Sequence, residues 1–155
     1  MPVIGIVVTP NGKHPRVYAV VLEGSVDHPR VVDTFDLRTS SLEPAEQAVD
    51  LARHLSAKLA GNDLVAAGIR IAGMTPVARR SKVAFSRAHC EGAILFVLRE
   101  ALGTPVTLVD PVGAPKMVGM KKAELEELLG SLTSTGTNAD AVTAALAALA
   151  ESVSR

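Results

Sequence analysis

The sequence predicts an α/β fold built on a mixed five-stranded sheet with helices on both faces. Residues 1–37 contain three short apolar or β-branched runs separated by turns, and from residue 43 onward helical periodicity alternates with two further strand-like runs. Strands joined by tight turns pair antiparallel, whereas strands separated by a helix pair parallel through right-handed crossovers. We therefore expect an antiparallel meander on one side of the sheet and parallel strands on the other.

The meander is predicted from the three N-terminal runs and the two turns between them. The first turn contains Asn11-Gly12, which is a strong hairpin signal. The second turn contains Gly24, which has the backbone freedom that a tight turn needs. The three predicted strands are Val3–Thr9, Arg16–Leu22 and Arg30–Leu37.

The rest of the chain predicts alternating helices and strands. Apolar residues recur three and four positions apart in the helical segments, and short apolar runs mark the strands. The segment "PVGAPKMVGM" is predicted to be a loop. The predicted elements are a helix over Glu43–Leu59, a strand over Leu64–Ile71, a helix over Lys82–Leu102, a strand in "PVTLVD", a short helix in "KKAELEELLG" and a final helix from about Asn138.

Composition limits the classes of protein to consider. The 155 residues predict one domain, and the 16 basic and 16 acidic residues argue against a strongly basic nucleic-acid binder or a membrane-surface protein, although a local basic patch is compatible with them. Cys90, the single cysteine, forms neither an internal disulfide nor a cysteine-based zinc site. We see no signal peptide and no membrane-spanning run, so a cytoplasmic protein is expected.

Four stretches of the sequence resemble the RuvC-like Holliday-junction resolvase group, which has the ribonuclease H-like fold. The first resembles a strand in which the group reads Gly-Ile-Asp-Pro-Gly, and the last resembles a helix with Asp-Ala-Ala-Asp-Ala-Leu before an Ala/Leu run. The resemblance implies a single ribonuclease H-like domain over residues 1–155. The four stretches are "VIGIVVTPNG", "LVAAGIRIAG", "SKVAFSRAHCEGAILFVLREALGTPVTLVDP" and "TNADAVTAALAAL".

The resemblance also implies where catalytic residues would lie. Enzymes of this group bind two divalent ions with carboxylates on the first strand, the fourth strand and the last helix, and the ions activate water and stabilise the leaving oxygen. These acids fall on Val7, Arg70, Thr137 and Asp140, of which only Asp140 is an acid. Hard cations need oxygen ligands. The resemblance therefore implies a degenerate catalytic centre.

Asp140 and a basic cluster are the candidate site residues. Asp140 is either a remaining catalytic acid or a capping residue of a helix whose N-cap is Thr137. The basic residues follow the fourth strand, at the strand ends where α/β sheets place ligands, and they either contact phosphates or form a solvated loop. Arg70, Arg79, Arg80 and Lys82 are the predicted nucleic-acid contacts, with Arg87, Lys116, Lys121 and Lys122 as further cations of the same surface.

The residues and the resemblance together support two functional hypotheses. The leading hypothesis is a non-cleaving RuvC-like protein that serves as a nucleic-acid-binding or protein-interaction module and needs no cofactor. The expected partners of this module are branched or duplex DNA, another protein, or a second copy in a homodimer. No membrane partner is expected. The alternative is an active endonuclease that uses Mg²⁺ or Mn²⁺ at rearranged acids such as Asp140 and Asp110.

Overall fold

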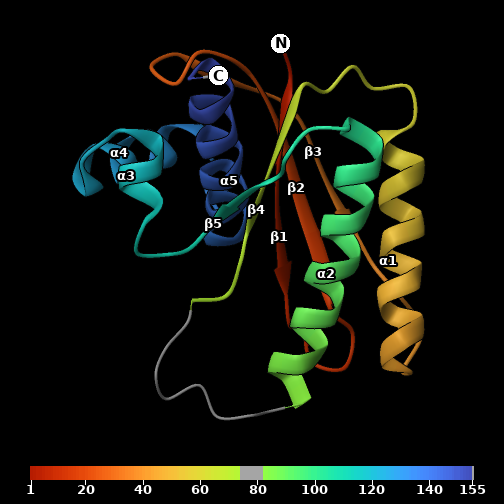
Figure 1. Ribbon diagram of the computed structural model, residues 1–155. Helices are drawn as coiled ribbons and strands as arrows, with labels where there is room; N and C mark the ends of the chain where they lie inside the picture. Colours follow the sequence, from red (N-terminus) through yellow and green to blue (C-terminus); the bar gives the residue numbers. More distant parts are fainter. Residues whose placement is uncertain (74–81, 155) are drawn as a thin grey trace.

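The structure is a computed structural model that describes residues 1–73 and 82–154. Within these residues the strands form one five-stranded sheet in the order β3-β2-β1-β4-β5 (Figure 1). The strands are β1 (Val3–Thr9), β2 (Arg16–Gly24), β3 (Pro29–Leu37), β4 (Ala66–Arg70) and β5 (Thr107–Val109). The helices are α1 (Pro44–Leu59), α2 (Lys82–Leu102), α3 (Ala114–Val118), α4 (Lys122–Leu132) and α5 (Gly136–Val153).

The pairing of the strands confirms the predicted mixed sheet. β2 pairs antiparallel with both β1 and β3, whereas β4 pairs parallel with β1 and β5 pairs parallel with β4. Gly12 and Gly24 have positive φ values of 61° and 102°, so both turns use the backbone freedom of glycine. The chain thus forms an antiparallel half and a parallel half that meet at β1.

Helices cover both faces of the sheet, as predicted. α5 lies on one face, with α3 and α4 beside it, and α1 and α2 lie on the other face (Figure 1). Successive residues of β1 alternate between the two sides, because Val3 and Val7 pack in the core under α5, whereas Ile4 and Ile6 pack in the core under α1 and α2. No helix within the described residues combines the length and hydropathy that a membrane span requires.

One helix was not expected from the sequence. The segment predicted to be a loop contains α3, and Asp110 satisfies the backbone before it by accepting hydrogen bonds from the amides of Val112 and Gly113, both at 2.9 Å. A helix of five residues is too short to show periodicity. The loop prediction was therefore wrong for Ala114–Val118.

The start of the last helix also differs from the prediction. α5 begins at Gly136, and its N-cap is Thr135, whose Oγ1 accepts a hydrogen bond from the backbone amide of Asn138 at 3.3 Å. Thr137 lies inside the helix, and Asp140 lies beyond its first turn. The interpretation of Asp140 as a capping residue paired with Thr137 was therefore wrong.

Candidate functional site

An ion pair between β4 and α5 forms the centre of the candidate site. Arg70 is the last residue of β4 and is the register partner of Val7 on β1. Its Nε lies 3.3 Å from Oδ1 of Asp140 on α5. The Arg70 side chain is 15% exposed and that of Asp140 is 46% exposed. The two side chains thus meet at the end of the parallel strands, where open α/β sheets place ligands.

Close packing of α5 on the sheet sets this pair in place. Gly5 and Gly68 are partners in the parallel ladder, and a Cβ atom on Gly68 would collide with the backbone carbonyl of Ala144. From Gly68 to Arg70 the strand advances about 6.6 Å. From Ala144 back to Asp140 the helix advances about 6 Å. The two distances match, so the glycine contact brings Asp140 over Arg70.

The Arg70 guanidinium has hydrogen-bonding capacity that no other described residue uses. Its Nη1 is buried, and this atom has no hydrogen-bond partner within residues 1–73 and 82–154. A guanidinium carries five N–H donors. A buried donor without a partner costs about 1–3 kcal/mol. The part of the Arg70 side chain that is exposed, with its charge only partly neutralised by a half-exposed carboxylate, is suited to an anionic ligand.

Arg70 and Asp140 line a groove of about 400 Å³ between α5 and the α3–α4 region. One part of the groove is charged or polar and consists of Arg70, Asp140, Thr143, Lys122 and Glu126. The other part is apolar and consists of Pro111, Val112, Ala114, Pro115, Leu125 and Leu129. The groove therefore joins a charged end, in which Arg70 and Lys122 stand beside the carboxylates of Asp140 and Glu126, to an apolar wall.

The structure brings together three of the four positions to which the resemblance assigned catalytic acids, and the fourth lies nearby on α5. Val7 and Arg70 are neighbours in the sheet, and Arg70 contacts Asp140. Thr137 lies three residues before Asp140 on α5, which places both near one face of that helix. These positions therefore lie at one end of the sheet, and only one of the four residues there is an acid.

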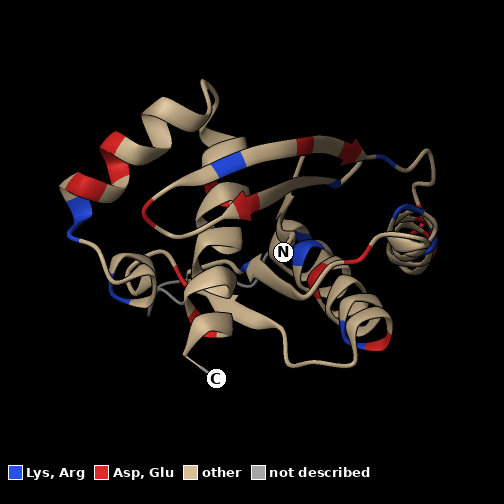
Figure 2. Cartoon of the chain, turned by 90° about the horizontal axis from the view of Figure 1, so that it is seen from above, with Lys and Arg blue, Asp and Glu red and all other residues tan. Residues whose placement is uncertain are grey.

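The predicted basic cluster is only partly assembled. Lys82 is exposed at the first residue of α2, whereas Arg79 and Arg80 lie outside the described residues. Arg87 is paired with Glu91 on the same helix, at 2.7 Å. Basic residues are spread over several helices and strands (Figure 2).

Among the predicted lysines, Lys122 joins the groove, but Lys116 lines a separate hollow beside Ala150 near the end of α5. The prediction that Lys116 shares the surface of Arg70 is thus not supported. Lys121 precedes α4, and its backbone amide donates to Glu124 at 2.9 Å.

The acids at this site do not fit a two-metal centre. Within the part of the chain that the structure describes, no three His, Cys, Asp or Glu side chains are grouped so that they could hold a metal ion. Asp140 is occupied by the Arg70 cation, and Asp110 by backbone amides before α3. The donor set of one carboxylate beside one guanidinium is unlike the oxygen-rich shell that Mg²⁺ or Mn²⁺ requires.

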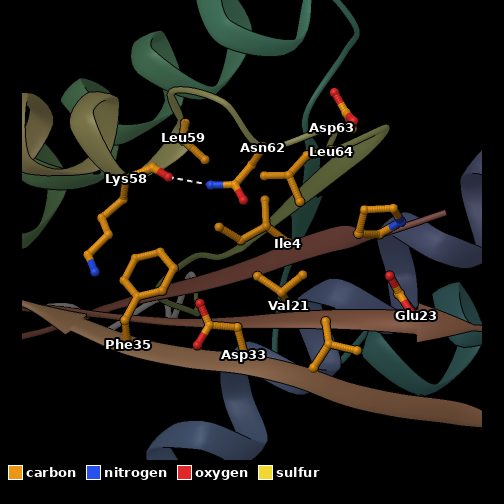
Figure 3. Close-up of a pocket in the computed structure, with 12 residues that line it drawn as sticks. Ile4, Val21, Glu23, Asp33, Phe35, Lys58, Leu59, Asn62, Asp63 and Leu64 are labelled. Carbon is orange, nitrogen blue, oxygen red and sulfur yellow. Dashed lines mark hydrogen bonds between the residues drawn. The ribbon is translucent and has the colours of Figure 1, made fainter.

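A second cleft, of about 350 Å³, lies at the other end of β1 and on the opposite face of the sheet (Figure 3). Carboxylates of Glu23, Asp33 and Asp63 line it. Lys58 also lines it, with Nζ 5.4 Å from the centroid of the Phe35 ring. The excess of carboxylates disfavours an anion, so the groove beside Arg70 is the better candidate for phosphate.

Helix α2 exposes an apolar stripe that was not expected from the sequence. Phe85 and Phe96 are 52% and 67% exposed, and the exposed His89 and Gly92 lie between them on the same side of the helix. Phe85 and Phe96 are 11 residues apart, which is close to three helical turns, so both lie on one side of α2. That spacing was the signal in the sequence that would have found the stripe.

Comparison with known proteins identifies the fold. No protein-family model and no curated protein matches the sequence. Two solved structures of RuvC from Thermus thermophilus are similar to the chain. The one in complex with a Holliday junction substrate is 21% identical, with a TM-score of 0.67 over 95% of this chain and 91% of RuvC. The second is 23% identical, with the same TM-score over 95% of this chain and 92% of RuvC. The chain therefore has a RuvC-like ribonuclease H-like fold.

Proposed function

We propose that this protein binds branched or duplex DNA without cleaving it, and that Arg70 contacts a phosphate at the position where a resolvase of this fold would hold metal. The observation that carries the proposal is the Arg70 guanidinium itself, which lines an open groove and is only partly neutralised by Asp140. The similarity in fold to a RuvC that was solved with a Holliday junction supports DNA as the ligand.

The absence of cleavage follows from charge and ligand type at the same positions. Val7 and Thr137 supply no carboxylate, and Arg70 supplies a positive charge. A guanidinium and a divalent ion about 4 Å apart, at an effective dielectric constant of about 20, would repel each other by about 8 kcal/mol. A phosphate is attracted by the same charge. The site therefore favours holding a phosphodiester over holding the ions that would cut it.

Other cations around the site would add sequence-independent contacts. Lys122 lines the groove, with its Nζ 3.8 Å from Oε1 of the exposed Glu126, and Lys82 is exposed at the start of α2. Arg79 and Arg80 stay predicted contacts, because they lie outside the described residues. Phosphate contacts of this kind position a protein on DNA and make its affinity strongly dependent on salt.

We also propose that the protein acts as a homodimer paired through the apolar stripe of α2. Exposed phenylalanines on one helix face are typical of a surface that is covered in the working assembly. A two-fold pairing would use the same face of both copies, so Phe85 would contribute from each side. Such a dimer would present two Arg70 sites, which suits a branched DNA with more than one equivalent arm.

A gel assay with a labelled four-way DNA junction tests the proposal. The junction is incubated at low salt with and without Mg²⁺ or Mn²⁺, and the gel shows both retardation and cutting. We expect retardation without cuts, weakened in Arg70→Gln and unchanged in Lys58→Gln, which removes one positive charge from the second cleft. Metal-dependent cuts that disappear in Asp140→Asn would instead support the rearranged endonuclease. A gel that shows no retardation and no cuts would overturn the DNA-binding proposal and favour a protein-interaction module.

A further inference from the structure

We infer that the groove beside Arg70 holds one unpaired nucleotide of the bound DNA, with its phosphate on Arg70 and its base against the apolar wall. This inference rests on the proposed function and deepens it, because it names the part of the DNA that the site recognises. The inference is carried by the two-part lining of the groove and by the Arg70 cation, which is partly exposed there and only partly neutralised by Asp140.

The chemistry of the groove restricts its ligand to a molecule with an anionic end and an apolar body. At one end, the Arg70 cation contacts Asp140 through Nε alone, so its exposed part can offer charge-assisted hydrogen bonds to a phosphate beside the carboxylates of Asp140 and Glu126. At the other end, Pro111, Val112, Pro115 and Leu129 present only carbon atoms from their side chains. A nucleoside monophosphate combines a phosphate with a base whose faces are apolar. Inorganic phosphate would leave the wall unused.

The size of the groove also fits a single nucleotide. Pockets that enclose a small ligand have volumes of about 300–1,000 Å³. A groove of about 400 Å³ lies near the lower limit, which admits one nucleoside and excludes a stacked base pair. The wall is built from aliphatic side chains, so it would contact the faces of the base by dispersion without selecting among the four bases strongly.

An unpaired nucleotide is the form of DNA that enters such a groove at the lowest cost. Taking a base out of a duplex stack costs a few kcal/mol, and the cost is smallest for a base that is already unpaired. Unpaired bases occur at junction centres, flaps and strand ends. The groove would therefore direct the protein to interrupted or branched DNA, while the surrounding cations would bind duplex of any sequence.

Direct titration of ligands into the full-length protein tests the inference. Isothermal titration calorimetry would compare dAMP, deoxyadenosine and inorganic phosphate on the wild type, Arg70→Gln, Val112→Trp and Val153→Trp. Val112 lines the groove and is 89% exposed, so the fold tolerates an indole there, which would narrow the apolar part of the groove. Val153 is a matched control, because it is similarly exposed but lies at the end of α5.

We expect dAMP to bind at least about tenfold more tightly than phosphate, and we expect this advantage to be lost in Val112→Trp and retained in Val153→Trp. Equal affinity for dAMP and phosphate, with no effect of Val112→Trp, would overturn the inference. So would tighter binding of a short peptide that ends in a free carboxylate, because the groove would then be a protein site. Thermal unfolding of each variant would show that it is folded.

The junction gel separates failure of this inference from failure of the proposed function. Retardation of the junction without dAMP binding would overturn the nucleotide groove and leave DNA binding intact. Binding of dAMP without retardation would overturn the DNA-binding proposal and support the groove as a site for nucleotides. A duplex with a one-nucleotide flap gives a second readout, since 2-aminopurine in the flap should change its fluorescence when the wild type binds, and not when Val112→Trp binds.

Discussion

Gly5 and Gly68 face each other across the parallel pairing of β1 and β4, and the backbone of α5 lies directly over both. A Cβ atom on Gly5 would collide with the carbonyl of Ala141, and one on Gly68 with the carbonyl of Ala144. Backbone atoms cannot move aside as a flexible side chain can. The distance between helix and sheet, and with it the contact between Arg70 and Asp140, therefore depends on these two glycines.

We predict that Gly68→Ala lowers the free energy of unfolding by about 3 kcal/mol, because overpacking of a close contact typically costs about 1–3 kcal/mol and backbone contacts lie at the upper end. Chemical denaturation monitored by circular dichroism measures the change. Gly130→Ala is the matched control. Gly130 is an exposed residue of α4 with free space around it, so this substitution should stabilise by up to about 1 kcal/mol. Equal stability of Gly68→Ala and the wild type would contradict the packing argument.

We predict that Asp140→Asn tightens DNA binding by about three- to tenfold at low salt. Arg70 would then be less neutralised, and an interaction between partly exposed charges is worth about 1 kcal/mol. The substitution removes the charge that partly neutralises Arg70 and leaves an amide of the same size. Fluorescence anisotropy with a labelled junction measures the affinity. Asp63→Asn makes the same change in net charge at the second cleft, so it should have little effect. If both variants tighten binding equally, net charge and not the Arg70 site is responsible.

We predict that acids placed at Val7, Arg70 and Thr137, the positions to which the resemblance assigned catalytic acids, create a metal site. In Val7→Asp/Arg70→Glu/Thr137→Asp, the three new carboxylates would converge with Asp140, and Mn²⁺ should raise the melting temperature because it binds only the folded state. Val7 is buried, and an unpaired carboxylate is costly to bury. In the absence of metal, this variant should therefore be less stable than the wild type. If the triple variant does not fold, Arg70→Glu alone can be tested in the same way, because it places a carboxylate beside Asp140 and leaves the buried Val7 unchanged.

The wild type should show no such stabilisation by Mn²⁺, because Arg70 repels the ion. Differential scanning calorimetry with and without the metal makes the comparison. A rise in the melting temperature of the wild type that disappears in Asp140→Asn would contradict the proposal that Arg70 has replaced metal at this site.

Cys90 should make the protein less stable in alkali. Burial raises the pKa of its thiol from 9.0 to about 11, with a smaller contribution from Glu91. Between these values the unfolded chain releases the proton while the folded protein retains it, so stability should fall as the pH rises above about 9. In Cys90→Ala this part of the pH dependence should be absent. Unchanged dependence in Cys90→Ala would show that other groups cause it.

Most elements of the fold were predictable because their patterns are long or strongly apolar. β1 and α2 have the predicted bounds, Val3–Thr9 and Lys82–Leu102. The fold itself was predicted from the order of the elements together with the resemblance. Failures occurred where local signals are short or ambiguous. α3 has only five residues, and Thr135 and Thr137 are equally good N-caps by residue type.

The candidate site was predictable only in outline. The resemblance placed Val7, Arg70 and Asp140 at one end of the sheet, and strand register brings the first two together. The ion pair depends on how closely α5 approaches the sheet, and the groove depends on how the α3–α4 region lies against α5. Both are tertiary relationships between segments far apart in the sequence, which periodicity does not encode. Leu125 and Leu129, for example, were visible only as the apolar side of a short helix.

Whether Arg70 contacts a phosphate is best tested by the salt dependence of DNA affinity, compared between the wild type, Arg70→Gln and Lys58→Gln. Each phosphate contact contributes about −0.9 to the slope of log affinity against log salt concentration on duplex DNA. If Arg70 makes such a contact, Arg70→Gln should weaken binding and make the slope shallower by the amount that one phosphate contact contributes. Lys58→Gln should have the affinity and the slope of the wild type. An affinity and slope in Arg70→Gln equal to those of the wild type would show that Arg70 does not hold the DNA.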